Sequence, residues 1–140
     1  MDQKRLSEIL PPERIVALKN DLKNYKIYYS HGICRCLKSL KYPEFVLRNN
    51  YSKQIPISIP IKIIDEIERL FYSKKDKDYN KGIEFTIAEC SEQHIIVVAI
   101  VKEGEQFIKK EGILWVQLRM WWALTHSKES VNRKWWGVKY

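Results

Sequence analysis

Apolar residues recur every three or four positions in the first third of the chain, which is the spacing of one face of a helix. A proline pair at positions 11 and 12 precedes this run, and proline is tolerated in the first turn of a helix. We therefore predict one helix over residues 12–29 and, after Gly32, a second over residues 33–41. The apolar positions are Ile15, Leu18, Leu22, Tyr25 and Tyr29 in the first helix, and Ile33, Leu37 and Leu40 in the second.

The next stretch of the chain has the features of extended backbone. Residues 45–47 and 55–59 predict two short strands, the second with isoleucine at every other position. Pro56 cannot donate a hydrogen bond to a neighbouring strand, so we expect this strand at an edge of the sheet. A helix over residues 60–71 and a charged loop over residues 73–81 follow.

Two further strands and a final helix complete the pattern. Residues 83–87 alternate between apolar and polar and predict a half-buried strand, with a further extension of the sheet over residues 106–108. Residues 94–101 are almost all apolar and β-branched, which is typical of a central strand covered on both faces. After Gly112 we expect a last helix, followed by a short strand or ordered tail over residues 132–140. The inner side of that helix is predicted to carry Leu114, Leu118, Trp121 or Trp122, and Thr125.

This order of elements predicts an α+β fold with a small mixed or antiparallel sheet. The sheet is accompanied by an N-terminal helix pair, a middle helix and a C-terminal Trp-rich helix. With 140 residues, and with only five glycines and five prolines, we expect one compact domain over residues 1–140.

The composition argues against several classes of protein. Hydrophobic residues make up 45% of the chain and charged residues 30%, as in a folded globular protein. No apolar run approaches the roughly 18 residues of a membrane span, and the first residues lead into no apolar signal segment. Three cysteines are too few for a disulfide framework. We therefore expect no membrane association, and a reducing, cytoplasmic location.

Positive charge is concentrated in two blocks of a chain whose formal net charge is +8. Residues 25–62 carry seven basic and one acidic side chain, and residues 113–140 carry five basic and one acidic. An acidic stretch over residues 63–112 separates the blocks. If the blocks meet in the fold, they form a positive face that attracts a polyanion.

All five tryptophans lie in the last 26 residues, interleaved with lysine and arginine. Aromatic rings stack on unpaired bases while cationic side chains hold phosphates, so this mixture is typical of single-strand binding. Neighbouring helical side chains lie about 100° apart, so one of Trp121 and Trp122 is expected at the edge of the buried side. In a strand, Trp135 and Trp136 would point to opposite faces. The expected nucleic-acid contacts are Arg35, Lys38, Lys41, Arg48, Lys53, Arg119, Arg133 and Lys134 for phosphates, and Trp122 and Trp136 for bases.

The same tryptophans fit a different function. Tryptophan buries a large area in cores and anchors protein interfaces. The alternative prediction is therefore a protein-interaction or structural subunit of a larger complex, or a homodimer, with the Trp-rich segment as its interface.

The sequence also contains side chains that bind metals or act as nucleophiles elsewhere. His31, Cys34, Cys36, Cys90 and His94 are of the ligand types that zinc prefers. Cys34 and Cys36 are only two apart, however, and no Cys-x-x-Cys pair or Gly-rich phosphate loop is present. Small buried cysteines are the simpler explanation of these thiols. We therefore predict no metal and no cofactor.

Two segments resemble known families. The strand and helix expected over residues 54–70 resemble the start of ribbon-helix-helix DNA-binding proteins, although a charged loop stands where that family has its second helix. The order of elements over residues 82–140 looks like the catalytic domain of tRNA-splicing endonucleases, which cleave RNA with a Tyr, a His and a Lys. That resemblance implies roles for His94 and Lys134, but Cys90 stands near the place of the Tyr, which implies a structural subunit. We assign the chain to neither family and predict a nucleic-acid-binding protein without catalytic activity.

Overall fold

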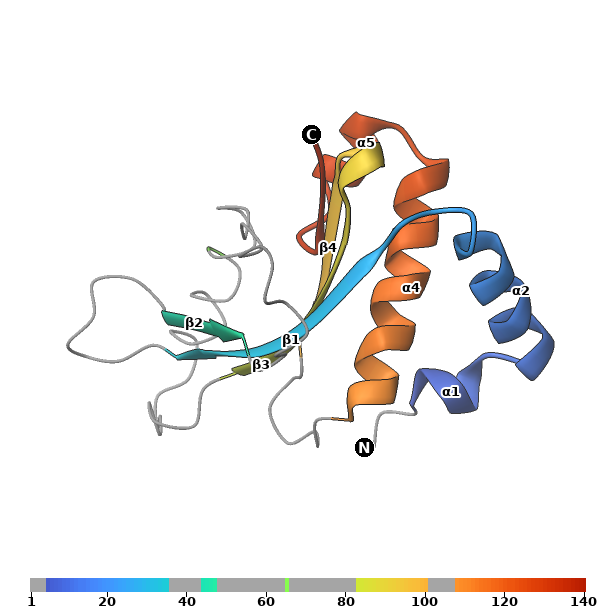
Figure 1. The fold of residues 1–140 in the computed structure, drawn as a ribbon, viewed down its shortest axis with the longest axis horizontal. Coiled ribbons are helices and arrows are strands. Elements are labelled where there is room, and N and C mark those ends of the chain that lie inside the picture. Colours follow the sequence, from blue (N-terminus) through green and yellow to red (C-terminus); the bar gives the residue numbers. More distant parts are fainter. Residues whose placement is uncertain (1–4, 36–43, 48–64, 66–82, 101–107) are drawn as a thin grey trace.

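The computed structural model describes residues 5–35, 44–47, 65, 83–100 and 108–140. Within them the chain forms an α+β fold around an antiparallel sheet with the strand order β2-β1-β3-β4-β5 (Figure 1). The strands are β1 (Tyr28–Arg35), β2 (Glu44–Leu47), β3 (Ile83–Cys90), β4 (Ile95–Ile100) and β5 (Gly137–Lys139). The helices are α1 (Leu6–Ile9), α2 (Pro12–Leu22), α4 (Lys109–Thr125) and α5 (Lys128–Asn132), and a short 3-10 turn, η1 (Ser91–Gln93), joins β3 to β4.

Strands β3 and β4 lie in the interior of the sheet, and the sequence predicted such a place for β4. Every residue of β4 from Ile95 to Ala99 is buried, which confirms a central strand covered on both faces. Strand β3 is more buried than its alternating sequence suggests, because Thr86 and Ala88 are buried together with Phe85 and Ile87. The prediction of a half-buried strand was therefore wrong, since helices cover the side of the sheet on which Thr86 and Ala88 lie.

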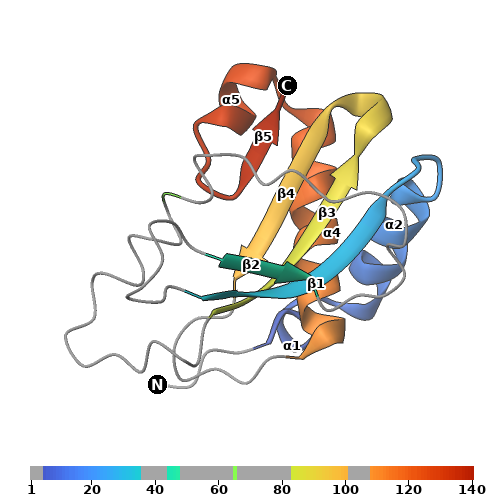
Figure 2. The same cartoon turned by 60° about the vertical axis from the view of Figure 1, so that its left-hand side comes forward.

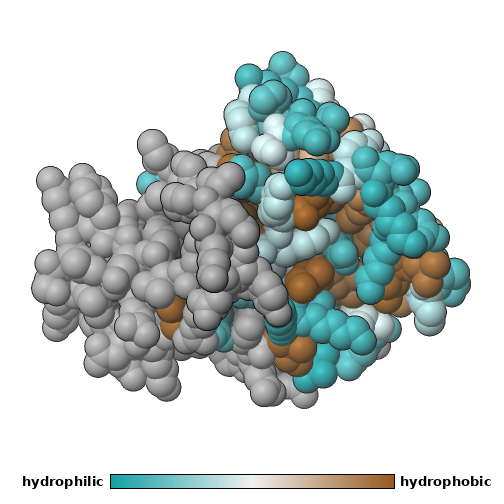
Figure 3. Space-filling model, in the orientation of Figure 1, coloured by the Kyte–Doolittle hydropathy of each residue, from teal (hydrophilic) through white to brown (hydrophobic). Residues whose placement is uncertain are grey.

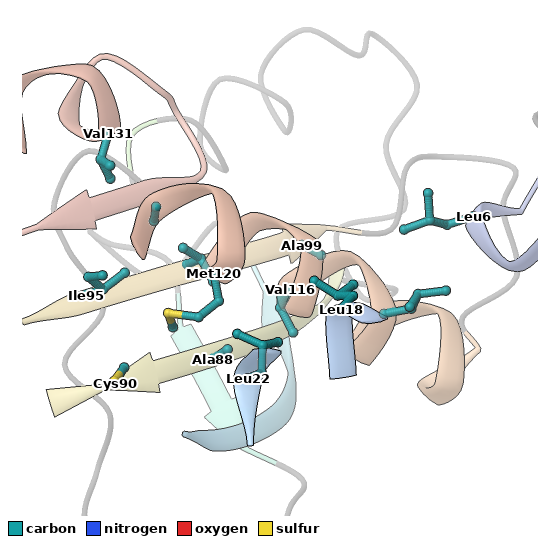
Figure 4. Close-up of a cluster of buried hydrophobic side chains, with 13 residues drawn as sticks. Leu6, Leu18, Leu22, Ala88, Cys90, Ile95, Ala99, Val116, Met120 and Val131 are labelled. Atoms are coloured by element: carbon teal, nitrogen blue, oxygen red, sulfur yellow. The ribbon is translucent and has the colours of Figure 1, made fainter. Parts of the chain in front are cut away.

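Helices α1, α2 and α4 lie on one side of the sheet (Figures 1 and 2). Helix α4 packs against β3 and β4, and α1 and α2 pack against α4. The core between them contains Leu18 and Leu22 of α2, Ala88 and Cys90 of β3, and Met120 of α4, among other buried side chains (Figure 4). The four-residue helix α1 is also tied to α4 by polar contacts: the backbone N–H and the hydroxyl of Ser7 both donate to the carboxylate of Glu111.

The N-terminal helix pair differs from the predicted one. Helix α2 ends at Leu22 rather than near Tyr29, and the second predicted helix begins on residues that form β1. Strand β1 pairs with β3 along one edge and with β2 along the other. In these two ladders, the backbone N–H and C=O groups of β1 bond to neighbouring strands, whereas in a helix they would bond within the helix. Tertiary pairing therefore overrides the helical spacing of the apolar residues.

The C-terminal part contains one helix more than expected. Helix α4 begins at Lys109, so Gly112 lies inside its first turn rather than before it. The short helix α5 was not predicted, and the ordered end of the chain is strand β5. Both Trp121 and Trp122 pack against the core, because the sheet, the N-terminal helices and the segment after α5 cover different sides of α4.

Several predicted elements lie outside the described residues. These are the strands expected over residues 55–59 and 106–108 and the charged loop over residues 73–81. Of the middle helix over residues 60–71, the structure describes Asp65, which is helical and exposed. The segment that resembles ribbon-helix-helix proteins is thus not described, apart from this residue.

Candidate nucleic-acid interface

One side of α4 carries a stripe of aromatic and cationic side chains. Trp115, Arg119, Trp122 and His126 are spaced by four, three and four residues, which places them one above another along the helix and its C-cap. This stripe faces the segment between α5 and β5, where Trp135 and Trp136 lie. We call Trp115, Arg119, Trp122, Trp135 and Trp136 the Trp–Arg cluster.

Strand β5 and helix α5 hold the segment between them, residues 133–136, against α4. We call residues 133–136 the returning segment. The backbone N–H of Val98 donates to the carbonyl of Trp136 over 2.8 Å, and the N–H of Tyr140 donates to the carbonyl of His94 over 2.7 Å. Ser127 is the N-cap of α5, and its hydroxyl oxygen accepts from the N–H of Ser130. The Lys139 ammonium donates to the carbonyls of Ala123 and His126, so it satisfies the end of α4.

Arg119 is the centre of the Trp–Arg cluster. Its guanidinium carbon lies 5.1 Å from the ring centroid of Trp115, 5.2 Å from that of Trp135 and 5.5 Å from that of Trp136. These distances are those of cation–π contacts. Its Nη1 also donates to the carbonyl of Val98 over 2.5 Å, beside the point where β5 begins. Arg119 therefore links the helix, the sheet and the returning segment.

Burial changes the acid–base behaviour of Arg119. Removal of water from the charged form lowers the pKa of its guanidinium to about 10. The guanidinium still carries its charge at neutral pH, although aromatic rings surround it. Such a cation is costly to bury, and the ring faces and the Val98 carbonyl offset that cost.

Trp122 lies at the other end of the stripe and is also surrounded. The imidazole of His126 stacks on it with the ring centroids 3.7 Å apart and the planes 15° apart. Trp136 meets it edge-on, and the ammonium nitrogen of Lys134 lies 5.0 Å from its centroid. Trp122 therefore presents little free ring surface to a ligand.

The exposed rings of the cluster are Trp115 and Trp135. Their exposed fractions are 37% and 36%, whereas Trp122 and Trp136 pack partly into the core. Sequence reasoning singled out Trp122 and Trp136 and passed over the two more exposed rings. The four-residue spacing from Trp115 to Arg119 was the signal available, because it predicts a stacked pair on one side of a helix. Trp135 and Trp136 lie in a turn before β5 and both contact Arg119, so the expectation for a strand does not apply.

The structure describes part of the predicted set of basic residues. Arg133 and Lys134 are exposed next to the cluster, whereas the guanidinium of Arg119 is largely buried in it. Arg35 ends β1, and its side chain is not among the described ones. Lys38, Lys41, Arg48 and Lys53 lie outside the described residues. A shared face for the two basic blocks therefore stays a prediction.

The candidate zinc ligands that the structure describes have different environments. His31 is buried and its Nδ1 lies 2.9 Å from the hydroxyl of Thr86, whereas Cys90 is a buried thiol of the core. Burial raises the pKa of the Cys90 thiol, which disfavours the thiolate that binds metal or attacks substrates. Among the described residues, no group of three or more His, Cys, Asp or Glu side chains is placed to hold a metal ion.

His94 and Lys134 also contact different residues. His94 stands in the left-handed conformation after η1, with a φ of 55°, and its ring meets that of Tyr140 edge-on. Lys134 lies over Trp122. Tyr140 pairs with His94 at one end of β5, whereas Trp136, two residues after Lys134, pairs with Val98 at the other end. The register of β4 and β5 thus does not bring His94 and Lys134 together.

Comparisons with known proteins give no relative. No protein-family model, no curated protein and no solved structure matches the chain. In the described part of the chain, no helix combines the length and the apolar character needed to cross a bilayer.

Proposed function

We propose that this protein binds single-stranded nucleic acid, without catalysis, through the Trp–Arg cluster. The observation that carries the proposal is the pair of exposed rings, Trp115 and Trp135, which lie on different segments and both contact one largely buried guanidinium. Base stacking on such rings contributes about 1–3 kcal/mol per base and needs bases that are not already stacked in a duplex. The exposed Arg133 and Lys134 next to the rings would contact phosphates.

The test is fluorescence anisotropy with labelled single-stranded RNA, single-stranded DNA and duplex DNA, at low and at physiological salt. We expect Trp115→Ala and Trp135→Ala each to weaken single-strand binding about tenfold, in line with the loss of one stacked base. The control is Tyr28→Ala, which removes an exposed aromatic ring on β1, three strands away from β5. Absence of binding at low salt, or equal losses in all three variants, would refute the proposal.

The second candidate is a protein-interaction subunit. Two apolar side chains of the helical layer, Ile9 and Val16, are exposed by 55% and 58%, and apolar surface is visible over these helices in Figure 3. Tryptophan and arginine are also the residue types that anchor protein interfaces. Light scattering distinguishes a homodimer from a monomer: a monomer at all concentrations removes the homodimeric form of this candidate.

We also propose a reducing, cytoplasmic location. It is supported by the small and odd number of cysteines and by the reduced, buried thiol of Cys90.

A further inference from the structure

We infer that Arg119 is a positioning residue that orders the rings of Trp115 and Trp135 for stacking, rather than a phosphate contact. The inference rests on the proposed function and assigns this arginine a role different from that of its exposed basic neighbours. Three observations support it: the contacts of the guanidinium, its burial, and the different segments of the chain that carry the rings it contacts.

The contacts of Arg119 leave little of it for a ligand. Three indole rings surround the guanidinium carbon at 5.1 to 5.5 Å, and one of its nitrogens donates to the Val98 carbonyl. A planar guanidinium stacks on aromatic faces while its N–H groups donate in its own plane, which an ammonium cannot do. Arg119 can therefore hold the rings and the sheet at the same time.

The rings that Arg119 joins come from segments that are far apart in the chain. Trp115 lies one turn earlier on α4, whereas Trp135 lies in the turn before β5. Partly exposed side chains lose conformational freedom when they bind, and fixing them beforehand reduces that cost. By contacting both rings, Arg119 holds them in their orientation before a nucleic acid arrives.

A positioning residue and a phosphate contact respond differently to salt. Each phosphate contact that is lost reduces the slope of log K against log salt by about 0.7 for a single strand. A side chain that acts through ring orientation lowers the affinity at every salt concentration and leaves the slope unchanged. The salt dependence therefore separates the two roles.

The variants are Arg119→Met, which keeps an unbranched side chain without charge, and Arg119→Lys, which keeps the charge without the planar fork. We expect both to weaken single-strand binding about tenfold with the wild-type salt slope. The matched control is Arg133→Gln, which should lower the slope by about 0.7. Circular dichroism and urea unfolding establish that each variant is folded, and Arg119→Lys carries the test if Arg119→Met does not fold.

A measurement without ligand tests the positioning directly. With 5-fluorotryptophan incorporated, each ring gives its own ¹⁹F resonance, which single Trp→Phe substitutions assign. We expect Arg119→Met to shift and narrow the resonances of Trp115 and Trp135, while that of Trp121 changes little. Unchanged Trp115 and Trp135 resonances would overturn the inference.

The binding data can also overturn the inference. A reduced salt slope in Arg119→Met that Arg119→Lys restores would show a phosphate contact, and wild-type affinity in both variants would show a purely structural residue. If the wild-type protein binds no nucleic acid but the ring resonances change as expected, the proposed function fails while the ordering of the rings by Arg119 stands.

Discussion

His31 is a titratable side chain buried between the sheet and the helices, where it is 7% exposed and lies 2.9 Å from the Thr86 hydroxyl. Burial lowers the pKa of its imidazole, and the positive charge of Lys109 lowers it further. The unfolded chain therefore binds a proton at His31 more readily than the folded protein does. Protonation of this one residue thus opposes folding.

This linkage predicts that the protein loses stability as the pH falls below about 6.5, the ordinary pKa of histidine. Above that pH the imidazole is neutral in both the folded and the unfolded state, so protonation of His31 no longer lowers the stability of the protein. Urea unfolding at pH 7.5 and pH 5.5 measures the loss. We expect His31→Gln to reduce the pH dependence, whereas the exposed His94→Asn variant, whose new residue also tolerates a positive φ, should retain it. Parallel pH profiles for the wild type and His31→Gln would contradict the prediction.

At the scale of elements, strand β5 lies at one edge of the sheet, where the side chain of Asn132 bonds to its backbone. The amide of Asn132, at the end of α5, accepts from the N–H of Lys139 over 2.8 Å and donates to its carbonyl over 3.0 Å. These two bonds replace those that another strand would make. An edge strand with unpaired backbone groups is a template for association, so Asn132 both holds β5 and blocks its outer side.

We predict that Asn132→Ala lowers the free energy of unfolding by about 1–3 kcal/mol, because two hydrogen bonds to the backbone are lost. The opened edge should also increase self-association at high concentration. Urea unfolding measures the first effect and light scattering the second. Lys128→Ala, an exposed substitution on the same helix, serves as the control. A fully monomeric Asn132→Ala protein of wild-type stability would show that the edge needs no protection.

At the scale of the whole molecule, one core joins the sheet to the helices. Met120 of α4 and Val97 of β4 are fully buried in it, and Val131 extends it to α5 (Figure 4). Gly137 lies at the C-terminal end of this core, where an added Cβ would lie 3.5 Å from methyl groups of Val97 and Val131. These are ordinary contacts, so the core has room for a methyl group at that position.

From the packing of this core we predict opposite changes in the free energy of unfolding for two alanine substitutions. Met120→Ala should lower the free energy of unfolding by about 2–5 kcal/mol, because it leaves a cavity between α4 and the sheet. Gly137→Ala should change it by less than about 1 kcal/mol, with a gain expected from the restricted unfolded chain. Urea unfolding measures both. A loss above 2 kcal/mol in Gly137→Ala would mean that β5 packs more tightly than these distances indicate.

Part of this architecture follows from local sequence alone. Strand β4 was predictable because an uninterrupted β-branched run suits a strand with both faces covered. Most of α4 was predictable from its apolar spacing, and the α+β class followed from the order of the elements. The concentration of tryptophan and basic residues in the last 26 positions also indicated where a cluster of aromatic and cationic side chains would lie.

The tertiary structure decided what depends on partners distant in the chain. Residues 28–35 form a strand because β3 and β2 pair with both of their edges, although their local spacing also suits a helix. The exposed rings turned out to be Trp115 and Trp135, because Trp122 and Trp136 are packed against each other and the core. Arg119 became the centre of the site only when α5 and β5 returned Trp135 and Trp136 to α4. Local sequence determines which backbone conformations and which chemistry are available, whereas long-range packing selects among them, because burial and pairing energies exceed local propensities.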